Sequence, residues 1–259
     1  MNIIVSIKQV PDTTDVRINP ETNTLVREGV KSIINPFDMY AIEEAVRLKE
    51  RFGGKAIVIT MGPPQAEAAL REAISMGIDE AILISDRAFA GSDTWATSYT
   101  LACAIKKIRD FDLIICGKQA TDGDTAQVGP GIAAHLGLPQ VTYVKKIEEA
   151  KEKSMRVERL MEEGFEIIET PLPALLTVVK EINEPRIPSL KGMMRSKSAK
   201  ITVWTAADIG ADPCSIGLKG SPTQVVKIFT PPAKEGGQIL KGDTEEIAAK
   251  IASLLKEVA

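Results

Sequence analysis

Histidine and cysteine, the side chains that build most zinc and iron–sulfur sites, are scarce in this sequence. Among 259 residues there is one histidine, His135, and there are three widely separated cysteines, Cys103, Cys116 and Cys214. No Cys-x-x-Cys pair occurs, which excludes a thiolate metal site built from this chain alone. A single histidine also argues against a multi-histidine metal site or a Ser-His-Asp catalytic set. Unpaired cysteines suit a reducing compartment, so we expect a cytoplasmic protein.

Long apolar runs and an excess of either charge are also absent. No run approaches the roughly 20 apolar residues of a membrane span. The N-terminal run from Ile3 to Ile7 lacks the basic flank and apolar core of a signal peptide, so we expect none. The formal net charge is −3. The chain therefore lacks the excess of basic residues that would indicate nucleic-acid binding. With 44% hydrophobic residues, the composition is that of a globular protein with a substantial core.

The single histidine lies where a helical pattern ends. His135 is the third residue of the run Ala-Ala-His-Leu-Gly, which closes at Gly137. A positive charge at that position complements the carboxyl-terminal end of a helix dipole, and we expect His135 to serve that role.

The first half of the chain contains a regular alternation of strand and helix patterns. Short apolar runs typical of buried parallel strands occupy residues 3–7, 56–60, 81–84 and 113–116. Amphipathic helix patterns lie between them, and their apolar stripes include Ala41, Ala45, Leu48 and Phe52, then Ala69, Leu70, Ala73 and Ile74, then Leu101, Ala104, Ile105 and Ile108. This alternation predicts an α/β fold, a parallel sheet flanked by helices with a Rossmann-like nucleotide-binding architecture.

The segment from Gln9 to Asn35 interrupts the alternation before the first long helix. Strand-like residues at 16–18 and 25–27 flank a turn-rich stretch that contains Pro20. The pattern predicts a small inserted hairpin.

The pattern changes again after residue 144. Residues 154–160 and 165–169, separated by Glu163 and Gly164, predict an antiparallel hairpin, and residues 175–179 predict a further strand.

We divide the chain into three parts on this basis. Residues 1–182 form the nucleotide-binding α/β domain, and residues 183–200 form a loop rich in proline and basic residues. Residues 201–259 form a C-terminal arm that ends in an amphipathic helix beginning at Asp243 or Thr244. Such a loosely patterned tail seldom stabilises itself, so we expect the arm to pack on a partner.

Ligands of open parallel sheets bind at the carboxyl ends of the strands, near the point where the strand order reverses. Four segments should therefore converge there. They are Ser6 to Lys8, Asn35 to Asp38, Thr60 to Gly62, and the loop that begins at Gly117.

The loop from Gly117 to Gly131 carries the strongest signal for a ligand. It follows a buried strand and enters a helix, whose free N–H groups and positive dipole end suit a phosphate. Asp122 and Asp124 have the wrong sign for phosphate contact, so we assign them to helix capping or to ribose hydroxyls. Phosphate contact is left to backbone N–H groups and to hydroxyls such as that of Thr125.

Two signals within this loop disagree about where the helix begins. Asp124 with Gln127 resembles a capping box, whereas Pro130 favours a start several residues later. A plain strand–helix connection with glycines at its turns is the competing interpretation of the whole loop. Neither Gly-x-Gly-x-x-Gly nor a Walker-type motif is present, which disfavours the ordinary Rossmann and P-loop ligand sites.

Two further segments have both a structural and a functional interpretation. Asn35 and Pro36 suit the cap and first position of a helix, and the same exposed helix start can also bind a ligand. The basic segment 186–200 places Leu190 and two methionines among cations. It is either a solvated loop or a docking patch for an acidic partner.

The order of several longer motifs resembles the β subunits of electron transfer flavoproteins. The resemblance spans essentially the whole chain. The motifs are Asn35-Pro36-Phe37, the run from Glu43 to Glu50, Met76-Gly77, Gly117-Lys118-Gln119-Ala120 with Asp122 and Asp124, the stretch from Val157 to Ile168, Pro173 to Thr177, and Asn183-Glu184-Pro185-Arg186.

This resemblance implies a heterodimer with an α subunit that carries FAD. In simple members the β subunit holds a structural AMP, and in electron-bifurcating members it holds a second FAD that NADH reduces. The implied nucleotide contacts are Ser6, Asn35, Pro36, Phe37, Asp38, Met61, Gly117, Lys118, Gln119, Ala120, Thr121, Asp122, Gly123, Asp124, Thr125, Ala126, Gln127 and Val128.

The resemblance also implies partner contacts in the basic segment. Leu190 resembles the leucine that anchors the family to acyl-CoA-type dehydrogenases, and Arg186, Met193 and Met194 accompany it. Ferredoxin or flavodoxin is the implied electron acceptor of bifurcating members.

The loop departs from the simple members at Gly123. They carry three consecutive acids there, whereas this chain reads Asp122-Gly123-Asp124-Thr125, a form that resembles bifurcating and nitrogen-fixation-linked members. We therefore expect FAD, with AMP as the alternative. A rival hypothesis of another class is an ATP-hydrolysing or nucleotidyl-transfer enzyme, for which Lys8, Lys118, Asp122 and Asp124 are the candidate residues.

Overall fold

The computed structural model describes residues 1–12, 32–226, 237 and 239–258. The chain divides into two units, Met1–Val226 and Lys227–Ala259, and each is described by itself. The boundaries expected after residues 182 and 200 lie inside the first unit. In the described part of the chain, no helix is long and apolar enough to cross a membrane.

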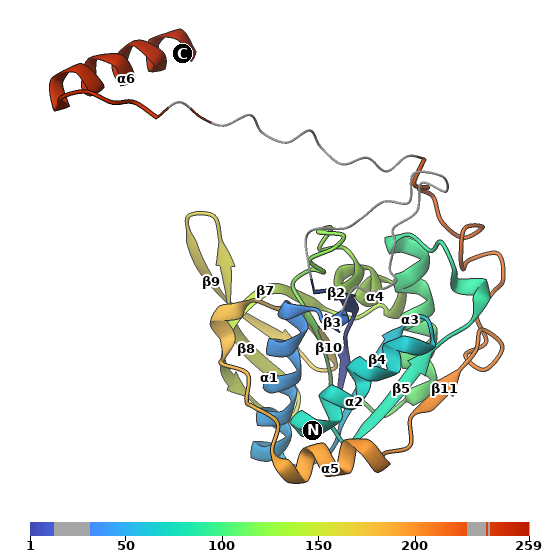
Figure 1. The fold of residues 1–259 in the computed structure, drawn as a ribbon. Coiled ribbons are helices and arrows are strands. Elements are labelled where there is room, and N and C mark those ends of the chain that lie inside the picture. The colour runs from blue at the N-terminus through green and yellow to red at the C-terminus, as the bar shows by residue number, and fades with distance from the viewer. Residues whose placement is uncertain (13–31, 227–236, 238, 259) are drawn as a thin grey trace. The chain divides into compact units, whose positions relative to one another are not determined.

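A nine-stranded sheet forms the centre of the first unit (Figure 1). All neighbours from β11 to β7 are parallel, while β8 and β9 continue the sheet in antiparallel fashion. In spatial order the strands are β11 (Thr202–Trp204), β5 (Glu80–Ile84), β4 (Ala56–Met61), β1 (Ile3–Ser6), β6 (Leu113–Gly117), β10 (Ala174–Val178), β7 (Gln140–Ala150), β8 (Ser154–Met161) and β9 (Gly164–Pro171).

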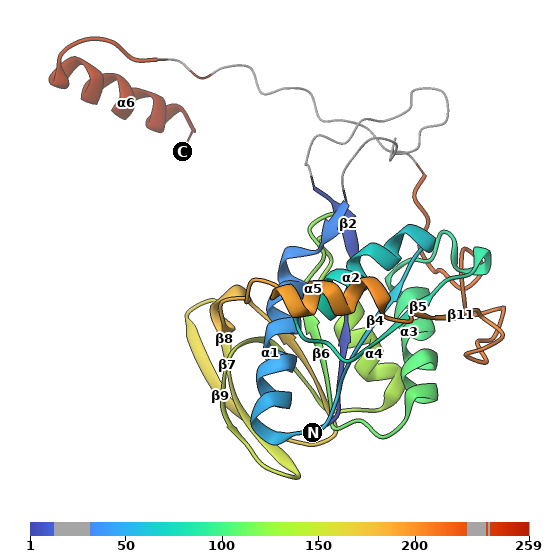
Figure 2. The ribbon, with the colours of Figure 1, turned by 60° about the horizontal axis from the view of Figure 1, so that its bottom comes forward.

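Helices cover both faces of this sheet, as the alternating pattern predicts. One face carries α1 (Pro36–Phe52) and α2 (Glu67–Met76), with α5 (Leu190–Ser198) packed beside α2 (Figure 2). The other face carries α3 (Thr94–Ile108) and α4 (Val128–Leu136). Short 3-10 helices lie at Pro64–Ala66, Arg87–Phe89 and Lys180–Ile182.

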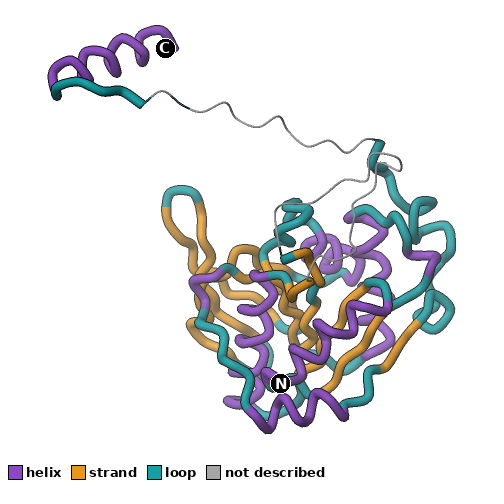
Figure 3. The backbone as a smooth tube through the Cα atoms, viewed as in Figure 1, coloured by secondary structure: helices purple, strands orange, loops and turns teal. Residues whose placement is uncertain are grey.

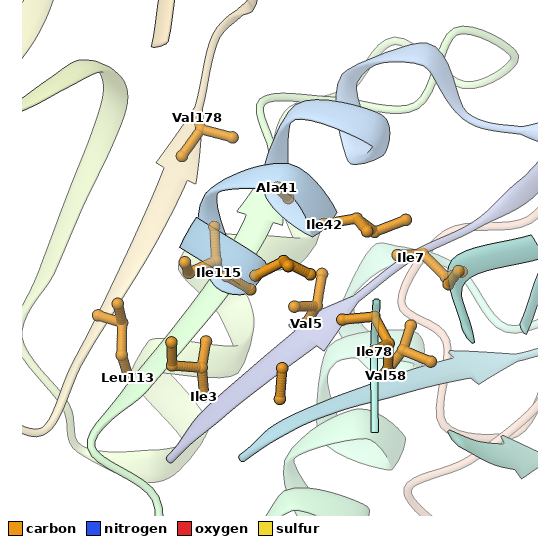
Figure 4. Close-up of a cluster of buried hydrophobic side chains, with 14 of the residues drawn as sticks. Ile3, Val5, Ile7, Ala41, Ile42, Val58, Ile78, Leu113, Ile115 and Val178 are labelled. Carbon is orange, nitrogen blue, oxygen red and sulfur yellow. The ribbon is translucent and has the colours of Figure 1, made fainter. Parts of the chain in front are cut away.

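Successive residues of each central strand enter different cores because side chains alternate across a sheet. Val5 belongs to the core beneath α1 and α2, whereas Ile4 belongs to the core beneath α3 and α4. Figure 4 shows Val5 and Ile115 facing Ala41 and Ile42 of α1. Strands buried on both faces explain why the sequence shows continuous apolar runs here rather than alternation.

The strand order reverses between β1 and β6. From β1 the chain passes through α1 and α2 to β4 and β5 on one side, and α3 then returns it to β6 on the other side. This is the switch point at which the sequence predicts a ligand site.

Two strands of the large sheet and one helix are missing from the sequence prediction. β7 is rich in Lys and Glu, and β11 has only three residues, so neither shows a clear strand pattern. The basic segment expected to be a loop contains α5, which begins where the Ser189 hydroxyl accepts the N–H of Gly192 at 3.0 Å. Contacts with α2 favour this helix, because the Arg71 guanidinium donates to the carbonyls of its last turn.

The insertion between β1 and α1 contains an antiparallel pair, β2 (Gln9–Pro11) and β3 (Ser32–Ile34). The strands expected at residues 16–18 and 25–27 lie outside the described residues. The predicted hairpin of β8 and β9 is confirmed, and Figure 3 traces it as two long strands.

The second unit contains α6 (Thr244–Val258). The Asp243 carboxylate caps it by accepting the N–H groups of Glu245 and Glu246 at 3.1 and 2.9 Å, which confirms the predicted helix start. Its apolar side chains Ile251 and Leu255 are exposed.

Candidate nucleotide-binding site

The carboxyl ends of β1 and β6 and the start of α1 come together at the switch point. The Asn35 amide joins two of these segments: its Nδ2 donates to the Gln119 carbonyl at 2.8 Å, and its Oδ1 accepts the Thr121 N–H at 3.1 Å. The Asn35 N–H donates to the Lys8 carbonyl at 2.8 Å. Three of the four predicted segments therefore share one hydrogen-bonded cluster.

Asp38 lies beneath this cluster. Its Oδ2 accepts the Lys8 N–H at 2.7 Å and its Oδ1 accepts the Gly117 N–H at 3.1 Å. Burial raises the pKa of Asp38 to about 7, although the N–H groups of Lys8 and Gly117 oppose that shift. Any side chain at position 117 would overlap Asp38 and the backbone of Phe37, so glycine is required there by space.

Asn35 occupies the cap position of α1, and Pro36 takes the first helical position as predicted. The Asn35 side chain makes no cap hydrogen bond, however, because it is bonded to the loop after β6. The capping interpretation is therefore right for the position and wrong for the side chain.

The helix after the loop begins later than the capping box predicts. α4 starts at Val128, with Pro130 in its first turn, and among the residues that the structure describes no side chain caps its N-terminus. Asp124 instead accepts a hydrogen bond from the Gln119 side chain. The capping box was wrong because Asp124 and Ala126 adopt positive φ angles of 51° and 55°, which end any helical turn before Val128.

The exposed part of the loop presents polar groups and an uncapped helix start. Lys8 and Asp122 form an ion pair at 2.6 Å that joins the loop after β1 to the loop after β6. A Cβ on Gly123 would meet no atom of the described residues within 4 Å, so packing within this part of the chain does not account for the glycine. Gly129 and Gly131, by contrast, let α4 pack closely against β10 and α3.

Lys118 points between two aromatic rings, and one of them was missed by the sequence analysis. Its Nζ lies 5.3 Å from the centroid of Phe37 and 5.3 Å from that of Tyr143, within cation–π range. Tyr143 has a φ of 59° and donates its N–H to Thr177 Oγ1 at 3.1 Å. No signal in the sequence indicates Tyr143, because only the placement of β7 beside β10 brings it to the site.

The remaining predicted contacts lie at the strand ends. Ser6 is buried at the end of β1, and Met61 is half-buried at the end of β4. Thr60 ties these two strand ends together, since its hydroxyl donates to the Ile7 carbonyl at 2.8 Å. The structure thus places all the predicted segments at one edge of the sheet.

A groove of about 1080 Å³ lies at the opposite edge, at the amino ends of β4, β5 and β11. Its basic side chains include Lys107, Arg109 and Lys200, which lie where α3 and α5 end. Cations at carboxyl-terminal helix ends complement exposed carbonyl groups. We therefore do not assign the nucleotide to this groove.

Comparison with known proteins establishes the family to which the chain belongs. The family model described as electron transfer flavoprotein domain matches residues 22–209. The chain is 54% identical to the electron transfer flavoprotein subunit beta of Thermoanaerobacterium thermosaccharolyticum, over 98% of both chains. The chain belongs to this family.

Other relatives of the family have more specific names. The chain is 54% identical to the caffeyl-CoA reductase-Etf complex subunit CarD of Acetobacterium woodii, covering 99% of this chain and 98% of the relative. It is 52% identical to the protein FixA of Azotobacter vinelandii, covering 89% and 84% respectively. Electron transfer flavoprotein β subunits work beside an α subunit, so membership implies a heterodimer.

The segment implied to contact family partners presents apolar side chains on α5. Leu190 and Met194 lie one helical turn apart and are 78% and 73% exposed, and Met193 is 41% exposed. Arg186 is engaged within the chain, where it pairs with Glu43 at 2.8 Å and with Glu50 at 2.7 Å. Although burial raises the pKa of Glu43, hydrogen bonds from Arg186 hold it below its ordinary value.

The single histidine of the chain lies where the sequence predicts, at the carboxyl-terminal end of a helix. His135 is in the last turn of α4, with its ring centroid 4.4 Å from that of Trp95. Burial lowers its pKa, which disfavours the charged form that would complement the helix dipole.

Proposed function

We propose that this chain is the β subunit of a heterodimeric electron transfer flavoprotein that holds FAD at the switch point between β1 and β6. The observation that carries the proposal is the exposed loop from Gly117 to Val128, which leads from the switch point into a helix start that no described side chain caps. N–H groups at the start of α4 suit the FAD pyrophosphate. Asp122 and Asp124 suit ribose hydroxyls.

The chain's own residues bind and orient the nucleotide, and the bound flavin supplies the redox chemistry. Lys118, held between Phe37 and Tyr143, places a positive charge at the edge of the site. We assign no catalytic acid or base to the chain, since electron transfer needs none from the protein.

Flavin-based electron bifurcation is the activity we favour, with NADH or an acyl-CoA-type dehydrogenase as donor and ferredoxin or flavodoxin as acceptor. The name of the Acetobacterium woodii relative places that protein in a caffeyl-CoA reductase complex, which supports such a partner. The exposed Leu190 and Met194 are the proposed dehydrogenase contacts, and α6 is the proposed contact with the α subunit. A cytoplasmic location stays a prediction.

Cofactor content tests the proposal directly. The chain is co-expressed with its α subunit, the purified heterodimer is denatured, and FAD and AMP are quantified. We expect two FAD and no AMP per heterodimer. One FAD with one AMP would keep the family site but make this chain a holder of structural AMP.

A variant control locates the second nucleotide. Gly117→Leu forces a side chain into the space filled by Asp38 and Phe37, so it should remove one nucleotide equivalent. Gly237→Ala, outside the first unit, adds a methyl group that meets no described atom within 4 Å, and this variant should retain both. Loss of neither equivalent in Gly117→Leu would contradict the assigned location.

A further inference from the structure

Asn35 and Asp38 are implied nucleotide contacts, yet the structure gives their polar atoms other partners. They are only 1% and 5% exposed, and each bonds backbone groups of the surrounding loops. A side chain that is buried and engaged in this way has little surface left for a ligand. Its influence on binding must pass through the backbone that it holds.

The backbone held by Asp38 belongs to two different strand ends. One carboxylate oxygen accepts from Lys8, just after β1, and the other accepts from Gly117, the last residue of β6. These two strands flank the switch point and pair with each other as far as Ser6 and Cys116, so Asp38 extends their connection into the loops that follow. The Asn35 side chain adds hydrogen bonds to the backbone of Gln119 and Thr121, in the loop that follows β6.

We propose that Asp38 is a positioning residue that fixes the backbone from Gly117 to Thr121 in its nucleotide-binding conformation by joining the ends of β1 and β6. The proposal rests on the proposed function, because it concerns the same nucleotide site. It reassigns Asp38 from direct nucleotide contact to control of the loop. Only a carboxylate supplies two acceptor oxygens for the two N–H groups.

An amide or a protonated carboxyl at this position can accept only one of the two hydrogen bonds that the Lys8 and Gly117 N–H groups donate. Each keeps one acceptor oxygen and directs a donor at the second N–H group, which then lacks a partner. Loss of one such charge-assisted hydrogen bond weakens a coupled equilibrium by about tenfold. Asp38→Asn therefore imitates the protonated residue.

The surroundings of Asp38 place this change near neutral pH. Burial raises its pKa to about 7. Among the described residues, the titratable groups that face it are Lys8, after β1, and the buried thiol of Cys116 on β6. Burial raises the pKa of the Cys116 thiol well above its ordinary value, so this thiol does not titrate between pH 6 and pH 8.

The test uses the heterodimer with its α-subunit flavin in place and its β-subunit nucleotide removed. Calorimetric titration with FAD at pH 8 should give a dissociation constant about tenfold higher for D38N than for the wild type. Between pH 8 and pH 6 the wild-type affinity should fall toward the D38N value, while the D38N affinity stays constant. FAD suits this series because its phosphate groups stay fully ionised.

Asp112 provides a matched control. Its carboxylate accepts the Asn2 N–H at 2.7 Å and so joins the same two strands, but at their amino ends. D112N should bind FAD as the wild type does. Equal affinities of D38N and the wild type at pH 8, or a wild-type affinity that does not change with pH, would overturn the proposal.

Hydrogen exchange separates positioning from direct contact. In the nucleotide-free heterodimer, amides of residues 117–121 should exchange faster in D38N than in the wild type. A direct ligand contact would leave them unchanged, and that result would reject the proposal. If D38N is not recovered folded, the wild-type pH series decides alone. Failure of the wild type to bind FAD or AMP removes the proposed function itself, and this proposal with it.

Discussion

Individual residues at the site are subject to opposing demands. Burial disfavours the charged form of Asp38, while two backbone N–H groups favour it, and the raised pKa shows that burial prevails. A group whose pKa is higher in the folded state binds more protons there than in the unfolded chain. Its contribution to the free energy of unfolding is therefore greatest below about pH 4 and declines until about pH 7.

Asp38→Asn should abolish the decline in the free energy of unfolding that Asp38 causes as the pH rises toward 7. One pKa unit corresponds to about 1.4 kcal/mol, so the full effect is on the order of a few kcal/mol. The melting temperature of D38N relative to the wild type should be higher by several degrees at pH 8 than at pH 5. Thermal melting of both heterodimers at the two pH values measures this, with D112N as the control. A difference that is equal at both pH values would contradict the expected sign.

At the scale of elements, α5 combines an anchored face with an exposed one. Gly192 lies so close to the Ser75 carbonyl that a side chain there would overlap it, and Arg195 donates to the Ile74 carbonyl at 2.9 Å. The helix is thereby fixed against α2, and Leu190 and Met194 project away from it. A fixed helix presents an apolar pair without the entropy cost of ordering a loop.

Replacing Leu190 and Met194 with alanine should weaken binding to the dehydrogenase partner by tenfold or more, because each truncation removes roughly 1–2 kcal/mol of apolar burial. Surface plasmon resonance with the purified dehydrogenase measures the affinity. Val226→Ala, which truncates a side chain that is 96% exposed outside α5, should bind normally. Unchanged affinity of the double variant would reject α5 as the docking surface.

The sequence predicts some elements well and others poorly, for physical reasons. Residues 3–7 and 113–116 are recognisable because strands buried on both faces must be continuously apolar. α5 is not, because Gly192 has a low helix preference, and the contacts with Arg71 that stabilise this helix cannot be seen in the sequence.

The same limits apply to the site. Gly117 and the segment 35–38 were located by their place after or near predicted strands. Tyr143 was not, because its position depends on the parallel pairing of β7 with β10. The partners of Asn35 and Asp38 are similarly invisible in sequence, since the bonded residues are 79 to 86 positions away within the loop after β6.

At the scale of the whole molecule, the second unit has an apolar helix face and a cap of its own. Ile251, Leu254 and Leu255 of α6 are 45%, 42% and 65% exposed. A helix of this length seldom stays folded in water without a surface that covers its apolar stripe. The proposed α subunit supplies such a surface.

Removal of residues 243–259 should therefore weaken the heterodimer while leaving the first unit folded. We expect a dissociation constant for the two subunits at least tenfold higher, measured by sedimentation equilibrium. Circular dichroism of the truncated heterodimer should lose only the helix signal of α6. Ile251→Asp with Leu254→Asp offers a milder form of the same change, and unaltered assembly of both variants would reject this role for α6.

The hydrogen bonds that join Asn35 and Asp38 to Gly117 and the loop after it also affect the order of folding. Contacts between positions so far apart along the chain form only after intervening loops have closed, at a cost in chain entropy. A nascent chain that ends before residue 113 contains β1 and α1 but lacks the partners of Asn35 and Asp38 in the ligand loop. The site is therefore completed late, and a bound nucleotide marks chains in which the central strands have already assembled.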